Sequence, residues 1–152
     1  MASDDDVKAV VYLSCLALDD ERFGDYLALY ADDFSYRVTA YSPELRQEMV
    51  WLDHGREQLA NLLESVDNHV RLPGRFTRQA NVYLVERDPA KGCATVTTSL
   101  VVMHTDPDVV SKAFAVGRYV DTIEVDGEKP LLKSREVRLE TRELGPGSHL
   151  PM

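Results

Sequence analysis

The chain has 152 residues, of which 44% are hydrophobic and 28% are charged, a composition typical of a globular protein with one core. Its net charge of −9 argues against a nucleic acid or an anionic membrane as partner, because both attract basic surfaces. No apolar run approaches the ~20 residues of a membrane span, the N-terminus does not resemble a signal peptide, and the two cysteines form no motif, so we expect a single cytoplasmic domain over residues 1–152.

The N-terminal part of the chain predicts two amphipathic helices and a strand. Apolar residues recur at helical spacing over residues 4–18, after Ser3 and Asp6, which form a capping box. An acidic break follows, and a second apolar stripe predicts a helix over residues 21–31. Strict alternation of side chains then predicts a strand over residues 34–41.

The next stretch, residues 42–52, predicts a loop, since its apolar patch at residues 49–52 lacks clear periodicity. Asp53 is a candidate N-cap for a third helix, which should end near Leu72, before a Pro-Gly pair. Residues 76–86 then predict a further strand.

Three long strands follow, over residues 94–105, 111–125 and 131–144, and turns containing Asp-Pro and Asp-Gly join them. The lengths of these strands are well above the usual ~5–6 residues, so we expect their sheet to curl. Other elements must then pack against its concave face. The order helix, helix, strand, helix and four strands predicts the α+β class. We expect a strongly curved antiparallel sheet packed on the N-terminal helices, a cone whose mouth is often a pocket.

The sequence offers little metal or phosphate chemistry. Cys15 and Cys93 have no Cys or His neighbour at ligand spacing, and the four histidines are scattered. There is no Gly-rich phosphate turn and no Gly-x-Ser-x-Gly elbow. We therefore predict no metal site and no cofactor site in this chain, with a site of two histidines and one carboxylate assembled in space as the alternative.

The sequence still allows acid–base catalysis inside the cone. The candidate groups are His54, Tyr36 and Asp121. A water-poor pocket can move the pKa of a carboxylate or an imidazole toward neutrality. His54 also fits a surface residue beside a helix start, and Tyr36 also fits the core. Alternation places Tyr119 and Asp121 on one face of their strand and Arg118 on the other, so these three cannot all point inward without a bulge.

The last predicted strand is rich in charge, and we expect a charged outer face there. Its members are Arg135, Glu136, Arg138, Glu140, Arg142 and Glu143. The alternation along each predicted strand does not bring an acid and a base together inside the cone. We therefore expect side chains to fill the cone.

Five segments resemble the small (β) subunit of aromatic-ring-hydroxylating, Rieske-type dioxygenases. They are residues 20–38, the patch at 49–52, the Gly-x-Tyr-x-Asp strand at 114–121, Lys133-Ser134-Arg135, and the ending His149-Leu150-Pro151-Met152. The patch at 49–52 is similar to that of oxygenases acting on aromatic carboxylates. The order and spacing of the segments carry the resemblance.

The resemblance implies the cystatin-like cone that these subunits share with nuclear transport factor 2 and ketosteroid isomerase. It also implies a non-catalytic, structural subunit of an oxygenase for aromatic compound degradation. The [2Fe-2S] Rieske cluster and Fe(II) would belong to a large (α) partner subunit, with three α and three β subunits, β–β trimer contacts, and the outer face of the sheet as the assembly surface. The alternatives are a stand-alone cone enzyme (isomerase, dehydratase or cyclase) that uses His54, Tyr36 and Asp121, and a small-ligand binding module or homodimer.

Overall fold

The computed structural model describes residues 2–64, 72–141 and 151–152. Its three helices are α1 (Asp4–Asp19), α2 (Phe23–Leu27) and α3 (Arg56–Glu64). Its six strands are β1 (Tyr30–Ser42), β2 (Gln47–Gly55), β3 (Arg75–Asp88), β4 (Cys93–Thr105), β5 (Ser111–Glu124) and β6 (Leu131–Leu139). No helix in these ranges is long and apolar enough to cross a membrane.

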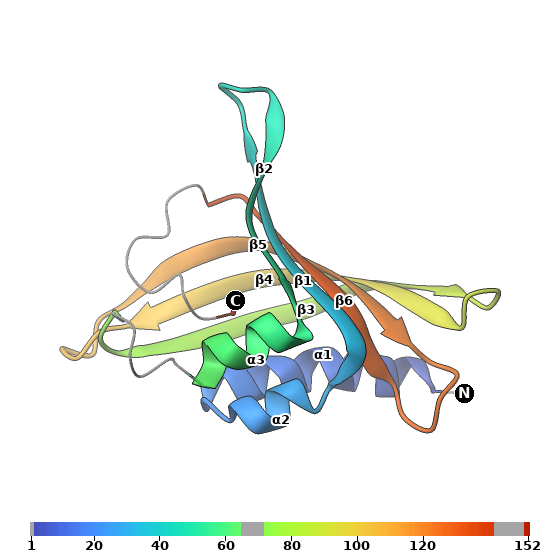
Figure 1. Cartoon of the computed structure of the whole chain (residues 1–152). Helices are drawn as coiled ribbons and strands as arrows, with labels where there is room; N and C mark the ends of the chain where they lie inside the picture. The colour runs from blue at the N-terminus through green and yellow to red at the C-terminus, as the bar shows by residue number, and fades with distance from the viewer. Residues whose placement is uncertain (1, 65–71, 142–150) are drawn as a thin grey trace.

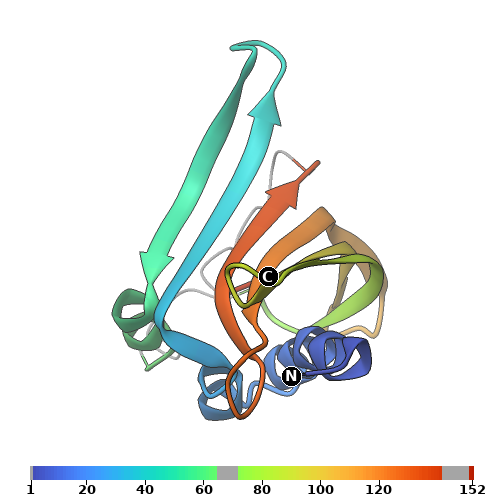
Figure 2. The same cartoon turned by 90° about the vertical axis from the view of Figure 1, so that its right-hand side faces the viewer.

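The strands form one sheet in the order β2-β1-β6-β5-β4-β3. The sheet curls around α1, and the helices lie against its concave side (Figures 1 and 2). The predicted α+β cone is therefore confirmed. The sheet is mixed, however, because β6 returns beside β1 and pairs with it in parallel, whereas the other four pairs are antiparallel.

α1 follows directly from its sequence. The amide of Asp6 donates to Ser3 Oγ, and the amide of Ser3 donates to Asp6 Oδ2, so the predicted capping box is confirmed. The apolar stripe of the helix is buried against the sheet, with Val7 and Val11 fully inaccessible. Arg87 of β3 adds a second anchor, since its Nη2 lies 2.7 Å from Asp4 Oδ1.

The second helix is much shorter than the predicted range 21–31. It ends at Leu27, and β1 begins at Tyr30. Two backbone contacts hold this segment extended: Arg56 Nη1 donates to the Tyr30 carbonyl at 2.6 Å, and the Leu132 amide donates to the Leu29 carbonyl at 2.8 Å. The tertiary contacts thus override a helical apolar pattern.

The predicted loop at residues 42–52 is wrong, because most of it belongs to β2. Together with the end of β1, this strand forms a hairpin arm that projects from the body of the cone (Figures 1 and 2). Tyr41, Leu45, Val50 and Trp51 are exposed on the arm. A strand with no buried face has no reason to alternate, which explains the missing period-two pattern.

The remaining boundaries agree with the sequence to within a few residues, except around the third helix and the last strand. Asp53 lies in β2, and α3 begins at Arg56, where Gln58 Oε1 accepts the Gly55 amide at 2.8 Å. Residues 65–71 of this predicted helix, and the last three residues of the strand predicted over 131–144, lie outside the described residues. Leu72, the predicted end of the helix, is described and is not helical, and β6 ends at Leu139.

Candidate functional site

Strand register brings the three candidate acid–base residues into one row. His54 of β2 is the partner of Tyr36 on β1, and Tyr36 is the partner of Arg135 on β6. Arg135 in turn is the partner of Asp121 on β5. The row therefore crosses four strands, with Arg135 between Tyr36 and Asp121.

A buried ion pair occupies the centre of this row. Arg135 Nε donates to Asp121 Oδ1 at 2.8 Å and Arg135 Nη2 to Oδ2 at 3.0 Å, and both side chains have 0% exposure. Nη2 also donates to Ser14 Oγ of α1, at 2.9 Å, and the guanidinium stacks 3.8 Å from the centroid of the Tyr119 ring. This fork-to-fork geometry is the strongest form of arginine–carboxylate contact.

The prediction that Arg135 belongs to a charged outer face is wrong. Arg135 alternates with Val137 and Leu139, and all three are buried. Glu136 and Arg138 do lie on the outer face and pair at 3.1 Å. Arg142 and Glu143 are outside the described residues, and Glu140 is exposed.

Protonation of the pair is controlled by burial and by mutual attraction. Burial raises the pKa of Asp121, and the guanidinium of Arg135 acts in the opposite direction. Burial lowers the pKa of Arg135, but Asp121 and Tyr119 together raise it well above its ordinary value, so Arg135 is charged. Because both carboxylate oxygens accept from this arginine, Asp121 has no free oxygen facing a cavity.

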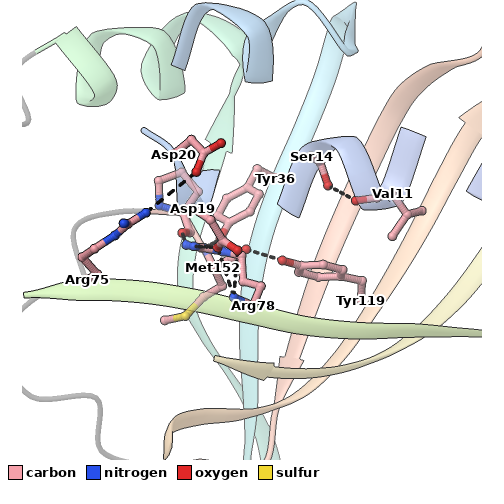
Figure 3. Close-up of polar contacts among 10 residues, drawn as sticks. Val11, Ser14, Asp19, Asp20, Tyr36, Arg75, Arg78, Tyr119 and Met152 are labelled. Carbon is pink, nitrogen blue, oxygen red and sulfur yellow. Dashed lines mark hydrogen bonds and ion pairs between the residues drawn. The ribbon is translucent and has the colours of Figure 1, made fainter. Parts of the chain in front are cut away.

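The end of the chain occupies the inside of the cone beside Tyr36. The Met152 amide donates to the Tyr36 hydroxyl at 2.9 Å, and the Tyr119 hydroxyl donates to the Met152 carbonyl oxygen (Figure 3). Arg78 Nη2 donates to the Pro151 carbonyl at 2.7 Å. Burial also raises the pKa of Tyr36, so this phenol is neutral.

Arg78 is itself held by the C-terminal end of α1. Its Nη1 lies 2.8 Å from Asp19 Oδ1, and its backbone amide donates to the same carboxylate at 3.0 Å (Figure 3). Its side chain is only 4% exposed. A shallow cleft lined by Leu18, Gly74 and Phe76 lies over this ion pair.

His54 takes no part in this network. It is half-buried on β2, and among the described residues its Nδ1 has no hydrogen-bond partner. Arg118 faces outward, as its alternation with Tyr119 and Asp121 predicts. Thus the row contains a paired aspartate and a neutral tyrosine, with the histidine at its edge.

The donor set does not fit a resident metal or cluster. Over residues 2–64, 72–141 and 151–152, no three side chains of His, Cys, Asp or Glu come together so that they could hold an ion. Cys15 is buried and Cys93 half-buried, and both are free thiols. We therefore assign no step of any reaction to a metal in this chain.

The outer face of β3, β4 and β5 is nearly free of charge. Its uncharged outward residues are Thr77, Gln79, Asn81, Leu84, Thr95, Thr97, Ser99, Val101, Met103, Val116, Val120 and Thr122. Two charged residues also face outward among these neighbours: Glu86 of β3 beside Thr95, and Arg118 of β5 beside Ser99. We refer to the uncharged residues as the outer patch.

The sequence did not predict the inward contacts of Arg78, Arg135 and Met152, although Arg135 and Met152 lie in segments that carry the family resemblance. A signal existed for Arg135, because it shares the period of Val137 and Leu139. For Arg78 and Met152 no local pattern was available, since their contacts join segments far apart in the chain.

The fold and the filled interior define a cone of the nuclear transport factor 2 type. A ketosteroid isomerase-like protein from Erwinia carotovora atroseptica has the same fold, with a TM-score of 0.60, 15% identity, and coverage of 89% of this chain and 94% of that chain. The β subunit of benzoate 1,2-dioxygenase from Burkholderia mallei superposes with a TM-score of 0.68 at 19% identity, covering 91% of each chain.

The chain belongs to the family of ring-hydroxylating β subunits, whose sequence pattern it matches over residues 14–145. It is 33% identical to the β subunit of methanesulfonate monooxygenase hydroxylase from Methylosulfonomonas methylovora, covering 97% of this chain and 86% of that protein. It is 32% identical to the β subunit of 2-aminobenzenesulfonate 2,3-dioxygenase from an Alcaligenes species, covering 93% and 94%. The family resemblance seen in the sequence is thus confirmed.

Proposed function

We propose that this chain is the non-catalytic, structural small subunit of a cytoplasmic multicomponent oxygenase, and that it assembles with a large α subunit as three α and three β chains. The Rieske cluster and the mononuclear iron of such an enzyme would belong to the α chain. Two features support this role: the family membership, and a cone filled by its own side chains and chain end.

The observation that carries the proposal is the outer patch. Charged residues make up 28% of the chain, whereas twelve adjoining outward positions on β3, β4 and β5 are uncharged and two among them, Glu86 and Arg118, are charged. Depletion of charge is the compositional mark of the centre of a protein–protein interface. Long strands also give the patch the extent that a stable interface of ~1,000 Å² or more requires.

Charge placed inside the patch tests this role. Thr97 lies at its centre, next to Val120 on β5 and Leu84 on β3. We expect Thr97→Glu to leave the isolated chain folded but to prevent its co-purification with the large subunit of the same oxygenase. The matched control is Ala90→Glu, which adds the same charge in an exposed turn and should leave assembly intact. A Thr97→Glu chain that still forms the complex at wild-type yield would contradict the proposal.

The two related β subunits suggest which acidic group the substrate of the complex carries. The two proteins named above belong to oxygenases for methanesulfonate and for 2-aminobenzenesulfonate. We propose that the complex containing this chain also oxidises a sulfonate, rather than the aromatic carboxylate suggested by residues 49–52. Oxygen uptake by the assembled complex should be greater with an arenesulfonate than with the matching benzoate, and the reverse order would reject this assignment.

A stand-alone acid–base enzyme is the second candidate, because His54, Tyr36 and Asp121 do lie in one row. It is less well supported, since Asp121 is bound on both oxygens and Met152 fills the space beside Tyr36. Such an enzyme would turn over a substrate without any partner chain, and His54→Ala would abolish that turnover. Turnover that requires the large subunit, and that survives His54→Ala, would exclude it.

A further inference from the structure

The last two residues of the chain are bound inside the cone much as a ligand would be. Pro151 and Met152 are both buried, and Met152 is 4% exposed and packs within the hydrophobic core (Figures 1 and 3).

The polar groups around this dipeptide match its backbone in order. Tyr36 of β1 accepts the Met152 amide, Arg78 of β3 donates to the Pro151 carbonyl, and Tyr119 of β5 donates to the Met152 carbonyl. Proline has no N–H group, so the first position brings no donor that would be left unpaired in the interior. These three backbone groups are therefore each bound by a side chain from a different strand.

Two of the three binding groups, Arg78 and Tyr119, are held by contacts that do not involve the dipeptide. Asp19 of α1 holds the guanidinium of Arg78 at 2.8 Å and its backbone amide at 3.0 Å. Arg135 stacks on the ring of Tyr119 at 3.8 Å. The site would therefore keep its shape if the dipeptide left, and its buried donors would lack partners, a state that favours rebinding.

We propose that the space inside the cone between Tyr36, Arg78 and Tyr119 is a peptide-binding site. The chain's own Pro151–Met152 occupies this site, which accepts the same dipeptide from solution. The ligand is an extended segment that offers a carbonyl, an N–H and a second carbonyl in that order. Its first residue is proline, and its second carries a flexible, unbranched apolar side chain that fits the core.

The experiment uses a chain that lacks residues 151 and 152, together with the blocked dipeptide N-acetyl-Pro-Met-amide. We expect this variant to melt at a lower temperature than the full chain, and the dipeptide to raise the melting temperature in a saturable manner. The control is the reversed dipeptide, N-acetyl-Met-Pro-amide, whose second residue lacks the N–H that Tyr36 accepts. Its dissociation constant should be roughly tenfold larger, the effect of about one hydrogen bond. The full chain should bind neither dipeptide, because its site is occupied.

A second measurement covers the case in which the shortened chain fails to fold. In the full chain, the Met152 amide should be protected from hydrogen exchange, and Tyr36→Phe should reduce this protection roughly tenfold while amides of β4 are unchanged. Equal affinity for the two dipeptides, or a shortened chain that melts like the full one, would overturn the proposal. An unprotected Met152 amide in the full chain would overturn it as well.

Discussion

Single residues inside the cone carry charge that water cannot screen. Asp121 and Arg135 are fully buried, and two hydrogen bonds join them, whereas Nη1 of Arg135 has no hydrogen-bond partner among the described residues. Removing one partner leaves the other as an uncompensated buried charge, whereas removing both leaves only an apolar gap to fill. The pair therefore ties β5 to β6 and, through Ser14, ties both to α1.

A double-mutant cycle tests the dependence of each charge on the other. We expect Asp121→Leu and Arg135→Met each to lower the free energy of unfolding by about 3–5 kcal/mol. The double variant should lose much less than the sum, because no unpaired charge remains. Urea denaturation followed by circular dichroism measures all four chains, and strictly additive losses would show that the two side chains act independently.

Gly117 tests how closely β5 and β6 approach one another. A Cβ atom at this position would collide with the Arg138 carbonyl oxygen and crowd the Leu139 backbone, neither of which can move alone. We expect Gly117→Ala to cost about 1–3 kcal/mol of stability. Gly24→Ala is the control, since nothing lies within 4 Å of that Cβ and α2 should gain about 0.5–1 kcal/mol. A Gly117→Ala chain as stable as the Gly24→Ala chain would contradict the steric argument.

At the scale of elements, α1 is held at both ends, by its capping box and by Asp19. Hydrogen bonds from the backbone and side chain of Ser3 lower the pKa of Asp6. A lowered pKa in the folded chain means that this contribution to stability is present above the ordinary value of 3.8 and is lost as the pH falls through the lowered pKa. The N-terminus of α1 should therefore loosen in acid.

Ser3→Ala removes one half of the box and should lower the stability of the chain by about 1 kcal/mol. Hydrogen exchange at the amides of Asp6 and Val7 measures the local effect. Asp6→Asn is the companion change, and it should abolish the acid-dependent loosening while the helix still forms. Acid-dependent exchange that persists in Asp6→Asn would show that another group titrates there.

The sequence could predict the elements whose side chains face one core. The four strands β3 to β6 and the helix α1 have such a face, and their patterns predicted that these elements exist, although Arg135 of β6 was predicted on the wrong face. The arm formed by β2 has no buried face, and α2 is cut short by backbone contacts from Arg56 and Leu132, so periodicity carried no information on either.

The sequence could predict which side chains of the candidate site face inward, but not the contacts between distant segments. Tyr36, Tyr119 and Asp121 face inward as their alternation requires, and Arg135 could have been found in the same way. The outward position of Arg118 follows from the same rule. The contacts of Arg78 with Asp19 and Pro151 depend on how the cone closes, which no local pattern records.

At the scale of the whole molecule, the cone buries an unusual number of groups that can lose a proton at high pH. Burial raises the pKa of five of them: Cys15, Tyr26, Tyr30, Tyr36 and Tyr119. In the folded chain these groups are neutral, and the two tyrosines at 36 and 119 also hold the chain end. The stability of the cone is therefore linked to alkaline pH.

The sign of this linkage is fixed by the raised pKa values. Below about pH 8 all five groups are protonated in both the folded and the unfolded chain, and stability does not depend on them. Above their ordinary values, 9.0 for the thiol and 10.0 for the phenols, the unfolded chain loses protons that the folded chain retains. Each group should then lower the free energy of unfolding by about 1.4 kcal/mol per pH unit.

We therefore expect the chain to unfold cooperatively between about pH 10 and 11, with the four buried phenols ionising in the same step. In a variant whose three exposed tyrosines, Tyr12, Tyr41 and Tyr83, are replaced by phenylalanine, absorbance of phenolate near 295 nm and far-ultraviolet circular dichroism should change together in a pH titration. Tyr26→Phe removes one of the five groups and should make the loss of stability above pH 10 less steep by about 1.4 kcal/mol per pH unit. Phenolate absorbance from all four buried tyrosines while the circular dichroism remains native would show that the cone opens to hydroxide without unfolding, and the filled interior inferred above would then be wrong.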